Sequence, residues 1–310
     1  PEAMAAGFEL AEMSRQLEQD ADALAAYART LGEILDARNY SNPWITLDEL
    51  RSRALAAVSY YVEAGKFEEA LKLAQSLDRI FSLPEATRVK AELYVNWGQA
   101  EVEEAAGLSS QEGSPIAVAG RRKFRLAGRT YEKLASLQKA TRLYPDDLWL
   151  AVESYMKGQG YQAAVHTLNE YLANESRKHH ARALLYLGEA QLNLGDSEAA
   201  LTAFEECIEF HPKDATAYQA RMLAATAHSE KGQFEEAEAL LQDNLNGALA
   251  PASREWRDSL FALGLLEYRE KRYSDAVGNL EQVIKREKDT AHAIDARYLI
   301  GKCYQLRGEE

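Results

Sequence analysis

The six histidines are the residues of this chain best suited to metal or acid–base chemistry, and their spacing favours neither. They stand at His166, His179, His180, His211, His228 and His292. No two of them form the His-x3-His pair that places two imidazoles on one helical face. The adjacent His179 and His180 would point about 100° apart on a helix, so they could not easily share an ion. The sequence predicts no metal site and no cofactor.

Paired carboxylates are the second set that could do chemistry. Glu68-Glu69, Glu205-Glu206 and Glu235-Glu236 lie in helical patterns, on the side away from the apolar residues. An acid–base pair would need two such groups to converge in a pocket, and nothing in their spacing requires that. The sequence also lacks a nucleophile elbow, a phosphate-binding loop and a dinucleotide fingerprint. We therefore expect a protein that is not an enzyme.

One basic cluster stands out in an acidic chain. It consists of Arg121, Arg122, Lys123 and Arg125, with Arg129 one turn later. Two interpretations are open. The cluster can be a solvated helix face whose charges pair with Glu101, Glu103 and Glu104. Alternatively it can be an anion patch for an acidic peptide or a phosphate, because arginine binds such groups bidentately.

The composition limits the partners. The chain has 310 residues, 46% apolar and 27% charged, and a net charge of −13. This charge argues against binding to nucleic acid or to anionic lipid. The sequence contains no apolar run of 18 residues, so we expect no direct membrane insertion. Cys207 and Cys303 are too few for a disulfide framework and are expected to be buried, which leaves a cytoplasmic and a periplasmic location both open.

The clearest pattern lies at 183–214, where two short amphipathic helices flank a turn at Gly195-Asp196. Gly188 inside the first helix costs about 1 kcal/mol against alanine, so a close packing contact is expected there. Ala200 and Phe204 lie in the second helix, and Pro212 ends it. This pattern resembles the tetratricopeptide repeat, a helix–turn–helix unit of 34 residues.

Similar hairpins recur along nearly the whole chain. Corresponding alanines at 164, 200, 237 and 276 are 36, 37 and 39 residues apart. We expect one all-α array over 1–310, with about seven and a half antiparallel hairpins, and the resemblance implies a right-handed superhelical solenoid. The segments are a degenerate hairpin at 3–37, a hairpin at 48–83, an irregular repeat at 85–143 with an inserted loop at 107–120, and the best-formed repeats at 145–308. The last hairpin is incomplete, so either the parent array continues or its helix serves as a cap.

The resemblance also implies a concave groove lined by the first helix of each hairpin. Residues off the packing stripe should face it: Trp149, Glu153, Met156, Arg182, Leu185, Glu189, Leu192, Met222, Phe261, Leu265, Tyr268 and Tyr298. The alternative is that neighbouring repeats cover much of this stripe. The stripe mixes large apolar groups with acids and lacks the lysine, arginine and asparagine set with which chaperone-binding members clamp a terminal carboxylate.

These features predict a non-enzymatic scaffold that binds another protein, as a peptide or an amphipathic helix laid in the groove. Two alternatives stay open. The chain can be an interaction or regulatory module of a larger enzyme. It can also be a cell-envelope assembly factor, because residues 291–308 resemble repeats of periplasmic and outer-membrane-associated proteins of this family, which would place it in a bacterial envelope.

Overall fold

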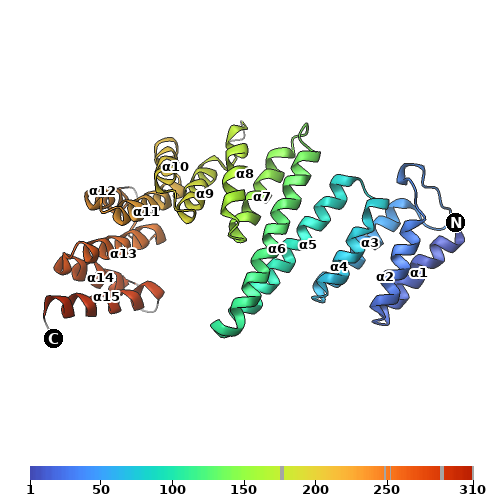
Figure 1. Ribbon diagram of the computed structural model, residues 1–310, viewed down its shortest axis with the longest axis horizontal. Helices are drawn as coiled ribbons and strands as arrows, with labels where there is room; N and C mark the ends of the chain where they lie inside the picture. The colour runs from blue at the N-terminus through green and yellow to red at the C-terminus, as the bar shows by residue number, and fades with distance from the viewer. Residues whose placement is uncertain (175–177, 248, 252, 287–289, 309–310) are drawn as a thin grey trace. The chain divides into compact units, whose positions relative to one another are not determined.

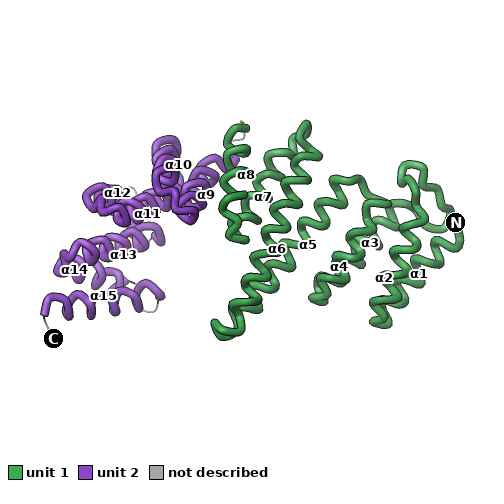
Figure 2. Tube along the Cα trace, viewed as in Figure 1, with its two compact units in different colours: residues 1–174 green, residues 175–310 purple. Residues whose placement is uncertain are grey.

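The computed structural model describes residues 1–174, 178–247, 249–251, 253–286 and 290–308. Within these ranges every regular element is a helix, as Figure 1 shows, so the predicted all-α helical solenoid is confirmed. The chain divides into two compact units, residues 1–174 and 175–310 (Figure 2). The single array over 1–310 stays a prediction.

The first unit consists of four antiparallel hairpins. Its helices are α1 (Glu2–Gln16), α2 (Asp20–Gly32), α3 (Leu47–Glu63), α4 (Phe67–Gln75), α5 (Leu83–Ala106), α6 (Ser110–Leu137), α7 (Tyr144–Lys157) and α8 (Tyr161–Ala173), with 3-10 turns at Ala37–Asn39 and Leu77–Arg79. The hairpin at the N-terminus is well packed, because Phe8 of α1 meets Tyr27 of α2 edge to face and both rings are fully buried.

The described residues of the second unit form three hairpins of the same kind and one further helix. Its helices are α9 (His180–Asn193), α10 (Ser197–Phe210), α11 (Ala215–Glu230), α12 (Phe234–Asn246), α13 (Arg254–Arg269), α14 (Tyr273–Arg286) and α15 (Ala291–Arg307). Among the residues described, no second helix of this chain follows α15.

Local sequence signals place the helix ends. Ser82 and Glu85 form a reciprocal capping box that begins α5, and the Asp196 side chain accepts a hydrogen bond from the Ala199 N–H at the start of α10. Each cap satisfies backbone donors that a helix start leaves without a partner. Gly195 turns between α9 and α10 with a φ of 83°, a conformation that glycine adopts without a steric penalty.

Small residues let the two helices of a hairpin approach closely. A Cβ on Gly188 would collide with the Phe204 ring, and one on Gly264 would lie 2.8 Å from Leu280 Cγ. In both pairs the large residue follows the glycine by 16 positions. The packing role expected for Gly188 is therefore confirmed, and Phe204 is fully buried over it.

Enlarging a small residue at these contacts is expected to destabilise the fold. Ala200 and Ala237 are fully buried in the second helices α10 and α12. Leucine at either position would overpack the hairpin and lower the free energy of unfolding by about 1–3 kcal/mol. Urea unfolding followed by circular dichroism measures this loss. Unchanged stability in both variants would contradict the packing register described above.

The prediction of an inserted loop at 107–120 is wrong. Helix α5 runs to Ala106 and α6 begins at Ser110, so only three residues turn between two long helices (Figure 1). The glycines of this stretch are contact residues: a Cβ on Gly120 would lie 2.9 Å from the Gly98 carbonyl oxygen, and one on Gly113 would collide with the Ala105 carbonyl. Their small size allows the two helix backbones to pack closely. A stretch of small residues selected for such packing has the same composition as a flexible loop.

Candidate peptide-binding surface

The residues predicted to line a groove lie on the first helices of both units. Trp149, Glu153 and Met156 are on α7 of the first unit, and the other nine are on α9, α11, α13 and α15 of the second. Each set is therefore considered within its own unit.

Two of the predicted groove residues are buried and cannot face a ligand. Trp149 is 5% exposed and packs on Tyr171 of α8 with the ring centroids 5.5 Å apart. Leu185 of α9 is also 5% exposed. The prediction is wrong for both, because neighbouring helices cover these positions of the stripe. Glu153 and Met156 remain half-buried on α7.

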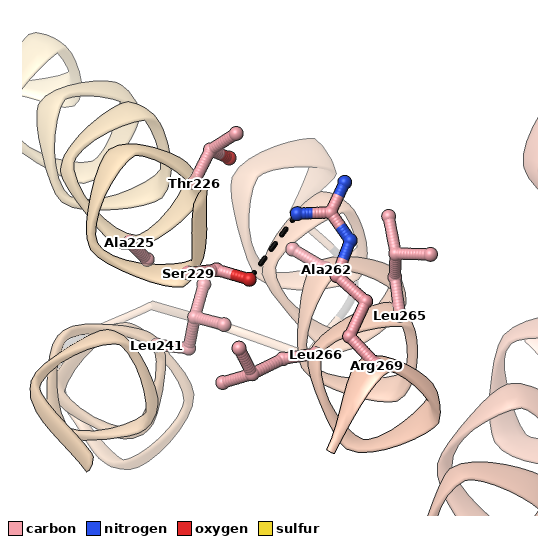
Figure 3. A pocket seen from close by; sticks show the side chains of 8 residues that line it. All are labelled: Ala225, Thr226, Ser229, Leu241, Ala262, Leu265, Leu266 and Arg269. Carbon is pink, nitrogen blue, oxygen red and sulfur yellow. Dashed lines mark hydrogen bonds between the residues drawn. The ribbon is translucent and has the colours of Figure 1, made fainter. Parts of the chain in front are cut away.

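A small cavity lies between α11 and α13. A cavity of ≈ 40 Å³ is lined by Ala225, Thr226, Ser229, Leu241, Ala262, Leu265, Leu266 and Arg269 (Figure 3). Its walls are mainly aliphatic, and the predicted groove residue Leu265 is one of them. Met222, one turn before Thr226, packs at the edge of the apolar core beneath it. A volume of this size holds a methyl-sized group or one water molecule.

Arg269 gives this cavity a polar side. Its Nη1 donates a hydrogen bond to Ser229 Oγ at 3.2 Å, and Figure 3 shows the two side chains meeting across the cavity from α13 and α11. Arg269 is exposed, whereas Ser229 is buried. A guanidinium has five N–H donors in a planar fork, so Arg269 can also bind a carboxylate or a carbonyl oxygen of a ligand.

Aromatic side chains extend the surface across α13 and α15. The Phe261 ring stacks on the His292 ring with centroids 4.6 Å apart, and His292 Nδ1 lies 3.3 Å from Asp258 Oδ1. Tyr298 is 65% exposed and has Lys302 Nζ 5.7 Å from its ring centroid. Tyr268 contacts Tyr273 with centroids 6.0 Å apart and is half-buried. This surface offers aromatic faces with charged groups at its edges.

On α9 the remaining predicted residues have mixed surroundings. Glu189 and Leu192 are half-buried, and burial raises the pKa of the Glu189 carboxyl group. Arg182 is exposed and helps line a second cavity of ≈ 350 Å³. His180 and His211 meet in that cavity, with Nδ1 and Nε2 2.9 Å apart. Sequence reasoning missed this pair, although an antiparallel hairpin brings the start of its first helix close to the end of its second.

The predicted anion patch is only partly available to a ligand. Lys123 Nζ lies 3.1 Å from the Trp97 ring centroid, and burial lowers the pKa of its ammonium group. Arg125 Nη1 donates to the Gly158 carbonyl at 2.6 Å and holds the turn between α7 and α8. Lys123 and Arg125 therefore each have a partner within the chain, and their part in the anion patch stays a prediction. Arg121 is half-buried and Arg122 is exposed. These two arginines remain a proposed anion patch.

The two cysteines are buried, and one of them has a shifted pKa. Cys207 and Cys303 are fully buried, and burial raises the pKa of the Cys207 thiol to about 11, which keeps it a thiol near neutral pH. The described part of the chain holds no group of three or more histidine, cysteine, aspartate or glutamate side chains that could bind a metal ion.

The lining residues of the α11–α13 cavity that were not predicted include Ser229, Ala262 and Arg269. Arg269 lies one turn after Leu265, and Ser229 lies three residues after Thr226. The prediction on α11 ended at Met222, two turns before Ser229, and on α13 Arg269 directly follows the predicted Tyr268, so the helical pattern indicated the right helices but not these two residues. Ala262 follows Phe261 directly, and only the packing of the two helices places it at the cavity.

Sequence comparison identifies the repeats. Models of the tetratricopeptide repeat match residues 150–215 and 258–290. The chain contains tetratricopeptide repeats. No curated protein sequence matches it. The first match contains Gly188, Ala200 and Phe204, and the second contains Gly264, Ala276 and Leu280.

Solved structures with tetratricopeptide repeats have the same fold. A signal transduction ATPase with numerous domains and a tetratricopeptide repeat sensor, from Pyrococcus horikoshii, matches with a TM-score of 0.55 and 14% identity, covering 98% of this chain and 44% of that one. Nearly identical repeats of a putative kinesin light chain from Podosopora anserina match with a TM-score of 0.50 and 18% identity, covering 67% of this chain and 97% of theirs. At these identities the likeness shows the fold alone.

None of the described helices is both long and apolar enough to cross a membrane.

Proposed function

We propose that this protein is an interaction scaffold whose second unit binds a segment of another protein along α11, α13 and α15. The observation that supports this proposal most is the cavity between Thr226 and Leu265, with Arg269 at its polar side. Exposed apolar area favours association with other molecules, so a half-buried apolar surface of this kind is typical of a solenoid that binds a partner.

The same surface suggests the chemistry of the partner. A methyl side chain, that of alanine, fits the aliphatic cavity, and an acidic or carbonyl group next to it can accept from Arg269. The aromatic faces of Phe261 and Tyr298 provide flat apolar area further along. An amphipathic helix places such side chains at three- and four-residue intervals, which is how helices bind in apolar grooves.

Peptides selected from a random display library against the intact protein test the proposal, because the selection samples many partner sequences at once. Thr226 and Tyr298 are exposed, so Thr226→Arg and Tyr298→Ala should leave the fold unchanged. We expect each to weaken the selected peptide about tenfold or more, because the first fills the cavity mouth and the second removes an aromatic contact. Isothermal titration calorimetry measures the affinity.

The matched control is Leu194→Ala, which removes an exposed leucine at the α9–α10 turn, away from α13. This variant should bind like the original protein. If Thr226→Arg and Tyr298→Ala also bind like the original protein, the proposed surface is not the binding surface.

A further inference from the structure

A cavity of ≈ 390 Å³ lies in the first unit, where the connectors between its hairpins meet. Its lining comes from residues 35–38, 47–51 and 78–82, which include both 3-10 turns and the start of α3. This volume is in the range of pockets that bind ligands. None of these residues belongs to the surface proposed above, so this connector cavity is independent of the proposed function.

Apolar side chains form one part of the lining. Leu47 and Phe81 are half-buried, whereas Leu35 is 91% exposed, more than any other large apolar side chain of the described residues. Leu83, which directly follows the lining residue Ser82, is 47% exposed. Exposed apolar area favours association with another molecule. An occupant that also covers Leu35 must extend beyond the cavity, which favours a segment of a protein chain over a small molecule.

Arg51 of α3 gives the cavity a positively charged side. Its Nε donates a hydrogen bond to the Ile80 carbonyl oxygen at 2.6 Å, and its guanidinium carbon lies 5.4 Å from the Phe81 ring centroid. Asp48 Oδ1 lies 3.6 Å from Arg51 Nη1, but the Asp48 side chain is 94% exposed, so this ion pair is weak. A guanidinium has five N–H donors, so Arg51 is held in place and still has donors for a ligand.

The other charges of the lining also favour an anion. The lining carries three arginines and two aspartates, whereas the whole chain has a net charge of −13. Both aspartates already have a cationic partner. Asp36 accepts from Arg38 Nε and Nη2 at 3.1 and 3.0 Å. Asp78 accepts from Lys90 Nζ at 3.2 Å. Arg79 is exposed, and its side chain makes no hydrogen bond or ion pair among the described residues. An acidic ligand can therefore pair with Arg79 without displacing a group of this chain.

We infer that the connector cavity binds an acidic segment of another protein. An apolar side chain of that segment, such as leucine, lies in the cavity and covers Leu35, and a neighbouring aspartate or glutamate accepts from Arg51 and Arg79. Such contacts are charge-assisted hydrogen bonds, which are stronger than neutral ones. The acidity of the rest of the chain opposes this binding only weakly at physiological salt, because exposed charges more than about 8 Å apart are largely screened.

A display library tests the inference when each of its peptides carries one leucine or phenylalanine among aspartates, glutamates and neutral polar residues. Selection against the intact protein should enrich a peptide whose affinity falls as salt rises. Arg79→Gln and Leu35→Ser should each weaken this peptide about tenfold or more, because the first removes a cation and the second an apolar contact. Both side chains are exposed, so thermal unfolding should be unchanged. Fluorescence anisotropy of the labelled peptide measures the affinity.

Two control variants make the same kinds of change elsewhere in the first unit. Lys72 is exposed on α4, Leu17 is 67% exposed between α1 and α2, and neither lines the cavity. Lys72→Gln and Leu17→Ser should bind the peptide like the original protein. Equal weakening by Lys72→Gln and Arg79→Gln would overturn the inference, because it would show an effect of net charge alone. Unchanged affinity in Arg79→Gln and Leu35→Ser, or no enriched peptide, would also overturn it.

Tyr298→Ala separates this cavity from the surface of the proposed function. The variant should retain the acidic peptide and lose peptides selected for the second unit. If Tyr298→Ala loses the acidic peptide while Arg79→Gln retains it, the peptide binds to the second unit, and the inference is wrong while the proposed function stands. If the acidic peptide depends on Arg79 but no selected peptide depends on Thr226 or Tyr298, the inference stands and the proposed function fails.

Discussion

Replacing Phe204 with alanine is expected to lower the free energy of unfolding by about 3–5 kcal/mol. The ring is fully buried and lies directly against Gly188, where even a Cβ would collide with it. Its removal leaves a cavity in addition to the lost transfer free energy. Urea unfolding followed by circular dichroism measures the total loss, and hydrogen exchange in α9 and α10 locates it.

Phe210 provides a matched control in the same helix. It is 63% exposed, so Phe210→Ala should change stability by no more than about 0.5 kcal/mol. Gly188 provides a second control. Gly188→Ala alone should destabilise the protein by collision with Phe204, whereas in the Phe204→Ala background it should restore part of the lost stability. Similar losses for Phe204→Ala and Phe210→Ala would contradict the hairpin packing.

Replacing Arg88 with methionine is expected to cost about 3 kcal/mol at neutral pH. Asp147 of α7 is 1% exposed, and Arg88 Nη2 of α5 donates to its Oδ1 at 2.6 Å. The other carboxylate oxygen, Oδ2, is buried and accepts no hydrogen bond within the described chain. Without Arg88 the charged carboxylate would be buried with no opposite charge, which disfavours the folded state.

The free energy of unfolding lost in Arg88→Met should depend on pH. Burial raises the pKa of Asp147, and the hydrogen bond from Arg88 opposes that rise. In the variant the folded protein therefore keeps a proton on Asp147 that the unfolded chain releases near its ordinary pKa. Stability then falls as pH rises from that ordinary pKa through the raised pKa of the folded state. Unfolding at pH 4.5 should show a smaller loss than unfolding at pH 7.

Asparagine at position 147 is the control for this charge. The double variant Arg88→Met with Asp147→Asn holds no buried carboxylate, so its stability should lose the pH dependence that distinguishes Arg88→Met from the original protein. A loss in Arg88→Met that is the same at pH 4.5 and pH 7 would mean that lost packing of the Arg88 stem, not the charge of Asp147, destabilises the variant.

The hairpins could be predicted from the sequence because the same packing geometry recurs. Gly188, Ala200 and Phe204 have counterparts at a spacing close to one repeat, so each predicts the next. The stretch at 107–120 could not be predicted for a related reason. Its glycines and serines suit a loop, and only the facing residues Gly98 and Ala105 reveal that they lie between packed helices.

The candidate site was less predictable, because helical position alone does not determine burial. Trp149 and Phe261 occupy the same kind of position on their first helices. Tyr171 contributes to covering Trp149, whereas Phe261 stacks on His292 and stays half-buried. The residues that determine whether such a position is buried come from neighbouring helices. The sequence pattern of one helix does not show which of them pack against it.

Hydrogen exchange of the intact protein with a library-selected peptide tests the central proposal most directly. The proposal predicts that the peptide slows amide exchange in α11 and α13, around Thr226 and Leu265, and that Thr226→Arg abolishes this protection. Protection confined to other helices, with α11 and α13 exchanging as in the free protein, would contradict it.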